Sequence, residues 1–301
     1  MPRALKPEFQ ACKHIDALLG GNRRRQWAVL KMIGEALQTA VQSDPQVVVS
    51  LSFVVGDEDD SLGLPEIPQS VLTSAVRRLS YYPRFDITDA TDITIARYYP
   101  GLKELMNGIY GTQKGQKFLA RVSERWADRV REGTSNLFLA RRINIGAPGT
   151  HHIAAYTRVP SFVGGSIWGF RGLTEDDAKI LCLWFNSSLF LLLVSDFRKQ
   201  IGGTWWVLDK HRVAQTKIPD LRLLSASQRN LLLTLFEDLR TVPFPSVVEQ
   251  LRTSFDGRRR VDSVWMTVLG VPANDHPGLL TSLYASLYGT LRSLLGAMGT
   301  E

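Results

Sequence analysis

Three groups of side chains in this sequence have the types that metal-binding or catalytic sites use. An acidic run covers residues 57–60, His151 and His152 are adjacent, and the two cysteines are Cys12 and Cys182. The carboxylates are consecutive rather than spaced as in a calcium loop, so they predict a solvated loop. The histidine pair has no cysteine or carboxylate beside it to complete a zinc site, which favours a base or phosphate contact, or a surface position. The cysteines provide neither a disulfide framework nor zinc-ligand spacing.

Motifs of the common enzyme classes are missing from the sequence. It contains no phosphate-binding loop of the GxxxxGK[ST] type and no G-x-S-x-G nucleophile elbow. No Asp…Glu-x-Lys grouping has the arrangement of a nuclease site. We therefore predict no catalytic, cofactor-binding or metal-binding residue in this chain, and whether it forms part of an enzyme stays open at this point.

Composition and charge favour a globular protein with a polyanionic partner. The 301 residues are 44% hydrophobic and 22% charged, as in an ordinary globular protein. The formal net charge of +7 suits phosphate binding, since lysines and arginines that neutralise phosphates release counterions. No stretch reaches the roughly 18 uncharged apolar residues of a membrane span. The first residues also lack the apolar segment of a secretory signal, so we expect a cytoplasmic protein without membrane contact.

The elements that would position polar side chains centre on residues 174–222. Thr174 is a suitable N-cap, with two aspartates in the first helical turn after it. The apolar run over 180–194 predicts a helix at the centre of a core. Residues 186–188, Asn-Ser-Ser, interrupt this run with polar groups, and buried polar groups need hydrogen-bond partners. We therefore expect another backbone to pack closely against this point and assign Asn186 and Ser187 a structural role.

An aromatic strand follows the helix. Gly202 and Gly203 end the helix, and residues 204–207 have strand character. Adjacent strand residues point to opposite faces, so one of Trp205 and Trp206 should be buried and the other exposed. An exposed indole here suits stacking on a base or sugar, or contact with a partner subunit.

The remaining pattern predicts an α+β fold: a small mixed sheet packed with helices, followed by a helical C-terminal region. A capping box at Ser225 and Gln228 opens one of the helices. The predicted strands cover residues 47–55, 85–94, 136–145, 152–158 and 161–170. The predicted helices cover residues 23–40, 70–79, 118–131, 226–240, 246–253 and 277–295. The last helix carries a stripe of leucines at spacing four: Leu279, Leu283, Leu287, Leu291 and Leu295.

The order of these features resembles the target-recognition region of N6-adenine DNA methyltransferases. That region follows the methylase domain in restriction-modification and phage-defence methylases, and type I specificity subunits carry a related pattern. The resemblance rests on SFVGGSIWGF (161–170), the helix with LWFNSSLFLLL (183–193), the glycine pair with its aromatics, and KIPDL (217–221). The second proline of the family's last strand is missing. Residues 258–271 resemble the family's R-x-x-lD-x-x-v-x-x-x-LGl helix, so the likeness covers about 98–271.

The resemblance implies a recognition module whose catalytic half is elsewhere. The family's adenine-binding Asn/Asp-Pro-Pro-aromatic loop is absent, and so is its glycine-rich turn for S-adenosylmethionine. A methylase subunit or domain would supply both, and S-adenosylmethionine would bind there. The partner of this chain would be double-stranded DNA, read at base edges and held at phosphates. The candidate DNA-binding residues are Arg141, Arg142, His151, His152, Arg158, Arg198, Lys199, Trp205, Trp206, Lys210 and Arg212.

Three parts follow from this comparison. We predict an N-terminal mixed α/β segment over 1–95, a recognition-like α/β domain over 96–222, and a helical spacer or docking region over 223–301. Two rival functions remain: a stand-alone enzyme, for which no catalytic cluster is found, and a helical protein-interaction module of a defence complex without DNA contact. The leucine stripe suits the second rival.

Overall fold

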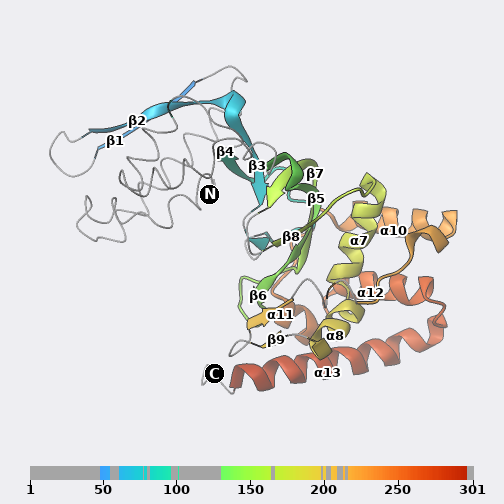
Figure 1. Ribbon diagram of the computed structural model, residues 1–301. Helices are drawn as coiled ribbons and strands as arrows, with labels where there is room; N and C mark the ends of the chain where they lie inside the picture. The colour runs from blue at the N-terminus through green and yellow to red at the C-terminus, as the bar shows by residue number, and fades with distance from the viewer. Residues whose placement is uncertain are drawn as a thin grey trace. The chain divides into compact units, whose positions relative to one another are not determined.

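The computed structural model describes residues 48–54, 61–76, 78–79, 82–95, 101, 130–163, 167–197, 199–200, 205–208, 213 and 216–296 (Figure 1). The chain forms two compact units, one of residues 1–76 and 90–134 and the other of residues 77–89 and 135–301. The predicted helix over 23–40, the acidic run at 57–60 and most of the predicted helix over 118–131 lie outside the described residues. The three-part division of the chain stays a prediction.

The described part of the first unit consists of two antiparallel strand pairs. Strands β1 (Val48–Val54) and β2 (Ser61–Pro68) pair with one register shift, and β3 (Leu72–Val76) pairs with β4 (Asp92–Ile95). The predicted strand over 47–55 is therefore confirmed. The predicted helix over 70–79 is wrong, because these residues form the short 3-10 helix Gln69–Val71 and then β3, where backbone hydrogen bonds go to β4 instead of along a helix.

The second unit contains two small sheets. One includes β7, β5 and β8 in that order, and the other includes β6, β10 and β9. Strand β5 runs antiparallel to β8, and β10 runs antiparallel to both of its neighbours, whereas Asp86 forms a parallel bridge with Tyr156. The strands are β5 (Thr134–Ala140), β6 (Arg142–Asn144), β7 (Ala154–Val163), β8 (Ile167–Phe170), β9 (Lys199–Gln200) and β10 (Trp205–Val207).

Strand boundaries in this unit differ from the predicted ones in three places. The strand expected over 136–145 is two strands, separated at Arg141. Strand β7 continues through Pro160, so the expected strand over 161–170 begins as the end of β7 and resumes as β8. The expected strand over 85–94 contains a turn at Thr88–Asp89 and reduces to the Asp86 bridge and β4.

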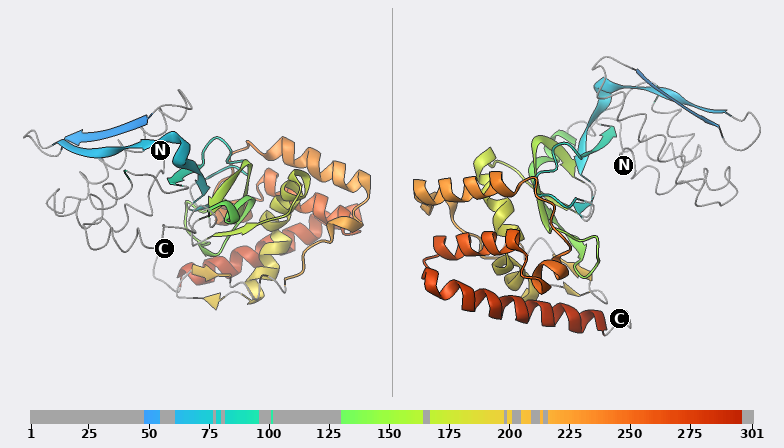
Figure 2. Two further views of the ribbon diagram at one scale, coloured as in Figure 1. Left: turned by 45° about the horizontal axis from the view of Figure 1, so that its top comes forward. Right: turned by 180° about the vertical axis from the view of Figure 1, so that it is seen from behind.

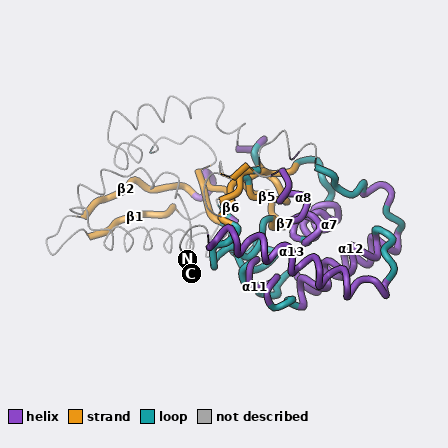
Figure 3. The backbone as a smooth tube through the Cα atoms, turned by 90° about the horizontal axis from the view of Figure 1, so that it is seen from below, coloured by secondary structure: helices purple, strands orange, loops and turns teal. Residues whose placement is uncertain are grey.

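The central apolar run forms two helices rather than one. Helix α7 (Glu175–Asn186) is capped by Thr174, whose side-chain oxygen accepts the amide of Asp177, as predicted. It ends at Ser187, and α8 (Ser188–Phe197) starts immediately after a bend of 62°. Helix α7 packs on β7 (Figure 3) and against the helix that follows residue 225.

The helical C-terminal region is confirmed. It consists of α10 (Ala226–Leu239), α11 (Val247–Arg252), α12 (Asp256–Val268) and α13 (His276–Gly296). Both hydrogen bonds of the predicted capping box open α10. Helix α12 ends at Val268, and Gly270 follows its C-cap with a φ of 81°, a left-handed conformation that favours glycine. Figure 2 shows α13 extending beside α11 and α12, both of which it contacts.

The buried face of α13 differs from the predicted leucine stripe. The side chains that face the protein are Leu280, Tyr284, Leu287 and Leu291, whereas Leu279 is 47% exposed. A uniform spacing of four residues drifts around a helix of 3.6 residues per turn. Alternating steps of four and three keep the apolar side chains on one face, and those are the steps between the buried positions.

Candidate nucleic-acid interface

Strands β6 and β10 place basic and aromatic side chains together. Trp205 is opposite Asn144, Trp206 is opposite Ile143, and Val207 is opposite Arg142. Residues directly opposite in a pair of strands share a face, and successive residues along one strand point to opposite faces. Trp206 is 1% exposed and Trp205 is 46% exposed, which confirms the prediction that one indole is buried and the other is not. Arg142 and Trp205 therefore lie on the solvent-facing side of this pair.

Arg141, at the bend between β5 and β6, contacts an aromatic ring of another strand. Its guanidinium carbon lies 5.0 Å from the ring centroid of Trp168 in β8. The indole N–H of Trp168 donates to the carbonyl of Leu208 at 3.2 Å, and the amide of Leu208 donates to the carbonyl of Arg141 at 2.9 Å. Arg141, Trp168 and Leu208, which come from three segments of the chain, therefore each contact the other two. We call Arg141, Arg142, Trp168 and Trp205 the basic–aromatic region.

Sequence reasoning missed Trp168 as a functional candidate. Its indole is half-buried and faces the guanidinium of Arg141. Trp168 is the tryptophan of the SFVGGSIWGF segment, and this position could have marked it as a candidate. The neighbouring sequence does not show that Arg141, 27 residues earlier in the chain, contacts it. The pairing depends on β8 lying beside β5, where Leu139 is opposite Trp168.

His152 does not belong to a DNA-binding surface, contrary to the prediction. Its side chain is 2% exposed and packs between Phe85 and Phe244, with ring centroids at 4.7 and 4.8 Å. Nε2 lies 2.9 Å from the carbonyl of Pro83, which only accepts, so Nε2 carries the proton. Burial lowers the pKa of the imidazole to about 3, against the opposing effect of that hydrogen bond. A neutral, buried imidazole cannot contact a phosphate.

The buried side chain of Trp206 is likewise unavailable to DNA, because it points into the core opposite Ile143. His151 is half-buried, and its carbonyl accepts a hydrogen bond from Gln250. Arg158, in β7, is exposed, and its amide donates to the side chain of Thr88.

Four other candidates are described in part or not at all. Lys199 lies in β9, where it is opposite Val207 of β10, but the structure describes only its backbone. Arg198, Lys210 and Arg212 lie outside the described residues. Their DNA contacts remain predictions, as do those of Arg141, Arg142, His151, Arg158 and Trp205.

The predicted structural role of Asn186 is confirmed. Its side-chain oxygen accepts the amides of Ile153 and Ala154 at 3.0 and 3.1 Å, and its side-chain nitrogen donates to the carbonyls of Ala154 and Cys182 at 2.9 and 3.0 Å. The closely packed backbone expected at this position is therefore the start of β7. All four hydrogen-bonding positions of the amide are used, so Asn186 fixes the end of α7 to the sheet.

A buried ionic network joins the start of α8 to the C-terminal helices. The carboxylate of Asp262 accepts the amide of Ser188 and the hydroxyl of Tyr284, both at 2.7 Å. The guanidinium of Arg258 donates to the Ser188 hydroxyl at 2.9 Å and to the side-chain oxygen of Gln250 at 2.8 Å. Burial lowers the pKa of the Arg258 guanidinium, and the charge of Asp262 opposes this effect. We call these five side chains the α8-start network.

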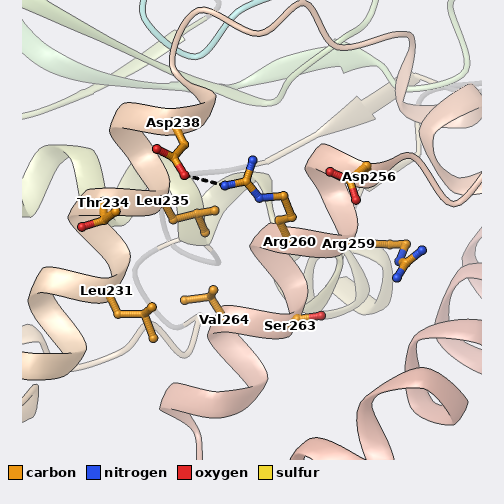
Figure 4. Close-up of a pocket in the computed structure, with 9 residues that line it drawn as sticks. All are labelled: Leu231, Thr234, Leu235, Asp238, Asp256, Arg259, Arg260, Ser263 and Val264. Carbon is orange, nitrogen blue, oxygen red and sulfur yellow. Dashed lines mark hydrogen bonds and ion pairs between the residues drawn. The ribbon is translucent and has the colours of Figure 1, made fainter.

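A shallow groove lies between α10 and α12, with a volume of about 320 Å³ (Figure 4). Leu231, Leu235 and Val264 provide its apolar surface, and an ion pair of 2.6 Å joins Arg260 to Asp238 across it. Asp256, Arg259 and Ser263 line one side. The groove holds no grouping of titratable side chains suited to acid–base chemistry.

The described residues contain neither a metal-binding group nor a single helix that could span a membrane. No group of three or more histidine, cysteine, aspartate or glutamate side chains there is arranged to bind a metal ion. No single described helix has the length and apolar composition to cross a membrane. Helices α7 and α8, which are separated by a bend, have that length and composition only when they are counted as one segment. The residues of that pair are mostly buried, as in the core of a folded domain.

The fold is similar to one solved structure, that of the type IIG restriction endonuclease BpuSI. The TM-score is 0.56 at 14% sequence identity, and the match covers 88% of this chain and 32% of that enzyme. The sequence matches no protein-family profile and no curated protein. This chain thus spans about a third of the length of the endonuclease and has the α+β fold of that part of it.

Proposed function

We propose that this chain is the DNA sequence-recognition module of an N6-adenine DNA methyltransferase, in a restriction-modification or phage-defence system. It would act with a methylase catalytic domain that this chain does not contain. The observation that carries the proposal is the fold match, which takes in nearly the whole chain but only 32% of a restriction endonuclease. The sequence supports it, because the motif order resembles target-recognition regions while the adenine-binding and cofactor-binding motifs are missing.

In this mechanism the chain docks on duplex DNA, and its side chains reach base edges in the major groove while other basic residues contact phosphates. The basic–aromatic region provides two exposed arginines and an exposed indole on neighbouring strands. The partner methylase then flips the target adenine and transfers a methyl group from S-adenosylmethionine. The residues of this chain position the DNA and take no part in the transfer.

A salt titration with duplex DNA tests the proposal. Affinity measured by fluorescence anisotropy should fall steeply as salt rises, with a log–log slope of about −0.9 for each phosphate contact. The double variant Arg141→Ala/Arg142→Ala should bind more weakly. The matched control is Arg222→Ala/Arg252→Ala, which removes the same charge from exposed ion pairs with Asp220 and Glu249. Absence of salt-dependent binding to any duplex would contradict DNA recognition.

The α10–α12 groove favours a second candidate, a helical interaction module without DNA contact. Leu231 in the groove is 42% exposed, and an apolar side chain of a partner helix would bury it. Binding of this kind depends on apolar contact and should change little with salt. Co-purification with a methylase that persists at high salt, together with no affinity for duplex DNA, would favour this candidate over the first.

A further inference from the structure

We propose that Arg141 reads a guanine in the major groove and that Trp168 is the positioning residue that holds its guanidinium for this contact. The inference rests on the proposed function and makes it specific, because it names the base and the side chain that would recognise it. It also separates Arg141 from Arg142, which are indistinguishable in the sequence.

Arg141 and Trp168 form a stacked pair at the surface. The guanidinium of Arg141 lies over the indole of Trp168 at 5.0 Å from the ring centroid, the range of a cation–π contact. The indole is itself anchored, because its N–H donates to the carbonyl of Leu208. Leu208 in turn donates its amide to the carbonyl of Arg141. Both the platform and the backbone that carries the arginine are therefore fixed by the same short loop of contacts.

A guanidinium stacked on an aromatic ring can recognise a base with two adjacent acceptors. The planar guanidinium has its N–H groups in a fixed fork, and the O6 and N7 acceptors of guanine match that fork in the major groove. Stacking on an aromatic ring restricts the plane of the fork while the group remains at the surface, so less conformational freedom is lost when the base binds. A lysine at this position would keep the charge but lose the fork. A phosphate contact needs only the positive charge of the side chain, whereas a bidentate contact to guanine needs the planar guanidinium.

The neighbouring arginine, Arg142, has different surroundings from those of Arg141. Arg142 is exposed in β6 opposite Val207, whereas Arg141 lies at the bend that precedes this strand. No aromatic ring of the described residues lies within stacking distance of its guanidinium. The two arginines thus differ in backbone position and in aromatic support, which assigns base reading to Arg141 and leaves phosphate contact to Arg142.

The experiment is selection of binding sites from a random duplex library by the full chain. The wild type should enrich a guanine at one fixed position, with a preference of about tenfold to a hundredfold over other bases. Arg141→Lys should remove that preference while retaining most of the overall affinity. Trp168→Leu should weaken it, and Trp168→Phe, which keeps a ring, should restore it in part. Arg142→Lys and Trp205→Leu are the matched controls, and both should keep the guanine.

Each other result has a definite meaning. If Arg141→Lys still selects the same guanine, or lowers affinity equally for all sequences, the inference is overturned and Arg141 is a phosphate contact or a surface charge. If Trp205→Leu removes the guanine and Trp168→Leu does not, the positioning role of Trp168 is overturned. Absence of any salt-dependent DNA binding by the wild type would instead overturn the proposed function. Melting temperatures of all variants show that they are folded when tested.

Discussion

The basic–aromatic region and the α8-start network place the same side-chain chemistry in opposite surroundings. Arg141 is exposed and rests on the face of an indole, whereas Arg258 is 4% exposed and donates to Ser188 and Gln250. A buried arginine must have its donors satisfied inside the protein, which ties it to its neighbours. An exposed arginine, by contrast, is accessible to a ligand from solvent. Burial, rather than residue type, therefore separates the structural arginine from the candidate reading arginine.

The difference has an energetic side that can be measured. Removing a buried charged side chain leaves the neighbouring buried charge and polar groups uncompensated, whereas exposed substitutions change stability by less than about 0.5 kcal/mol. Variants of the α8-start network should therefore unfold the protein more easily, and variants of the exposed arginines of the basic–aromatic region should mainly alter binding. Buried polar groups elsewhere in the second unit should behave like the network, and the expected changes in stability are given below from the largest to the smallest.

The largest effect is expected for Asp262→Ala. This change leaves the Arg258 guanidinium buried without its nearby carboxylate and removes the acceptor of the Ser188 amide and the Tyr284 hydroxyl. The free energy of unfolding in urea should fall by about 3–5 kcal/mol. Asp256→Ala, at an exposed position of the same helix, is the control and should cost less than about 1 kcal/mol. A loss below 1 kcal/mol for Asp262→Ala would show that the network contributes little.

Asn186→Ala should be the next most destabilising change. It leaves the amides of Ile153 and Ala154 without the side-chain acceptor that they share in the buried start of β7. We expect a loss of about 2–4 kcal/mol in the same measurement, because unsatisfied buried amides cost more than the bonds contribute. Asn230→Ala, an exposed substitution in α10, should stay within about 0.5 kcal/mol. Equal losses for the two variants would be inconsistent with a fixed contact at the end of α7.

The buried His152 should make stability depend on pH. Its pKa falls from an ordinary 6.5 to about 3 on folding, so between these values the unfolded chain binds a proton that the folded chain does not. Stability should therefore decrease as pH falls from about 6.5 towards 3, by at most about 1.4 kcal/mol for each pH unit well inside that window. Urea unfolding at pH 6 and pH 5 gives the change in unfolding free energy with pH for the wild type and for His152→Phe. The difference between these two slopes is the contribution of His152. Identical slopes would mean that the imidazole is not buried in neutral form.

The smallest change in stability is expected for Arg141→Ala/Arg142→Ala. Both side chains are exposed, and only Arg141 stacks on a described aromatic ring, so the free energy of unfolding should change by less than about 1 kcal/mol while DNA affinity falls. Anisotropy and urea unfolding on the same preparation give both values. A large loss of stability would place Arg141 with the structural arginines and remove the contrast between the two regions.

Several local features could be predicted from the sequence. The Thr174 cap, the Ser225–Gln228 capping box and helices α10, α11 and α13 all depend on residues within a few positions of each other. The opposite exposure of Trp205 and Trp206 also follows from strand geometry alone. The need of Asn186 for a partner was evident as well, although the identity of that partner was not.

Other features depended on residues far apart in the chain. At the break in the apolar run, the amide of Ser188 donates to a carboxylate 74 residues later in the chain. His152 lost its predicted DNA contact because Phe85 and Phe244 bury its ring. The sequence by itself determined the helix caps, the C-terminal helices and the alternation within strands, since interactions between near neighbours decide them. Tertiary structure alone decided which polar side chains lose water and which face it, because packing between distant segments sets burial.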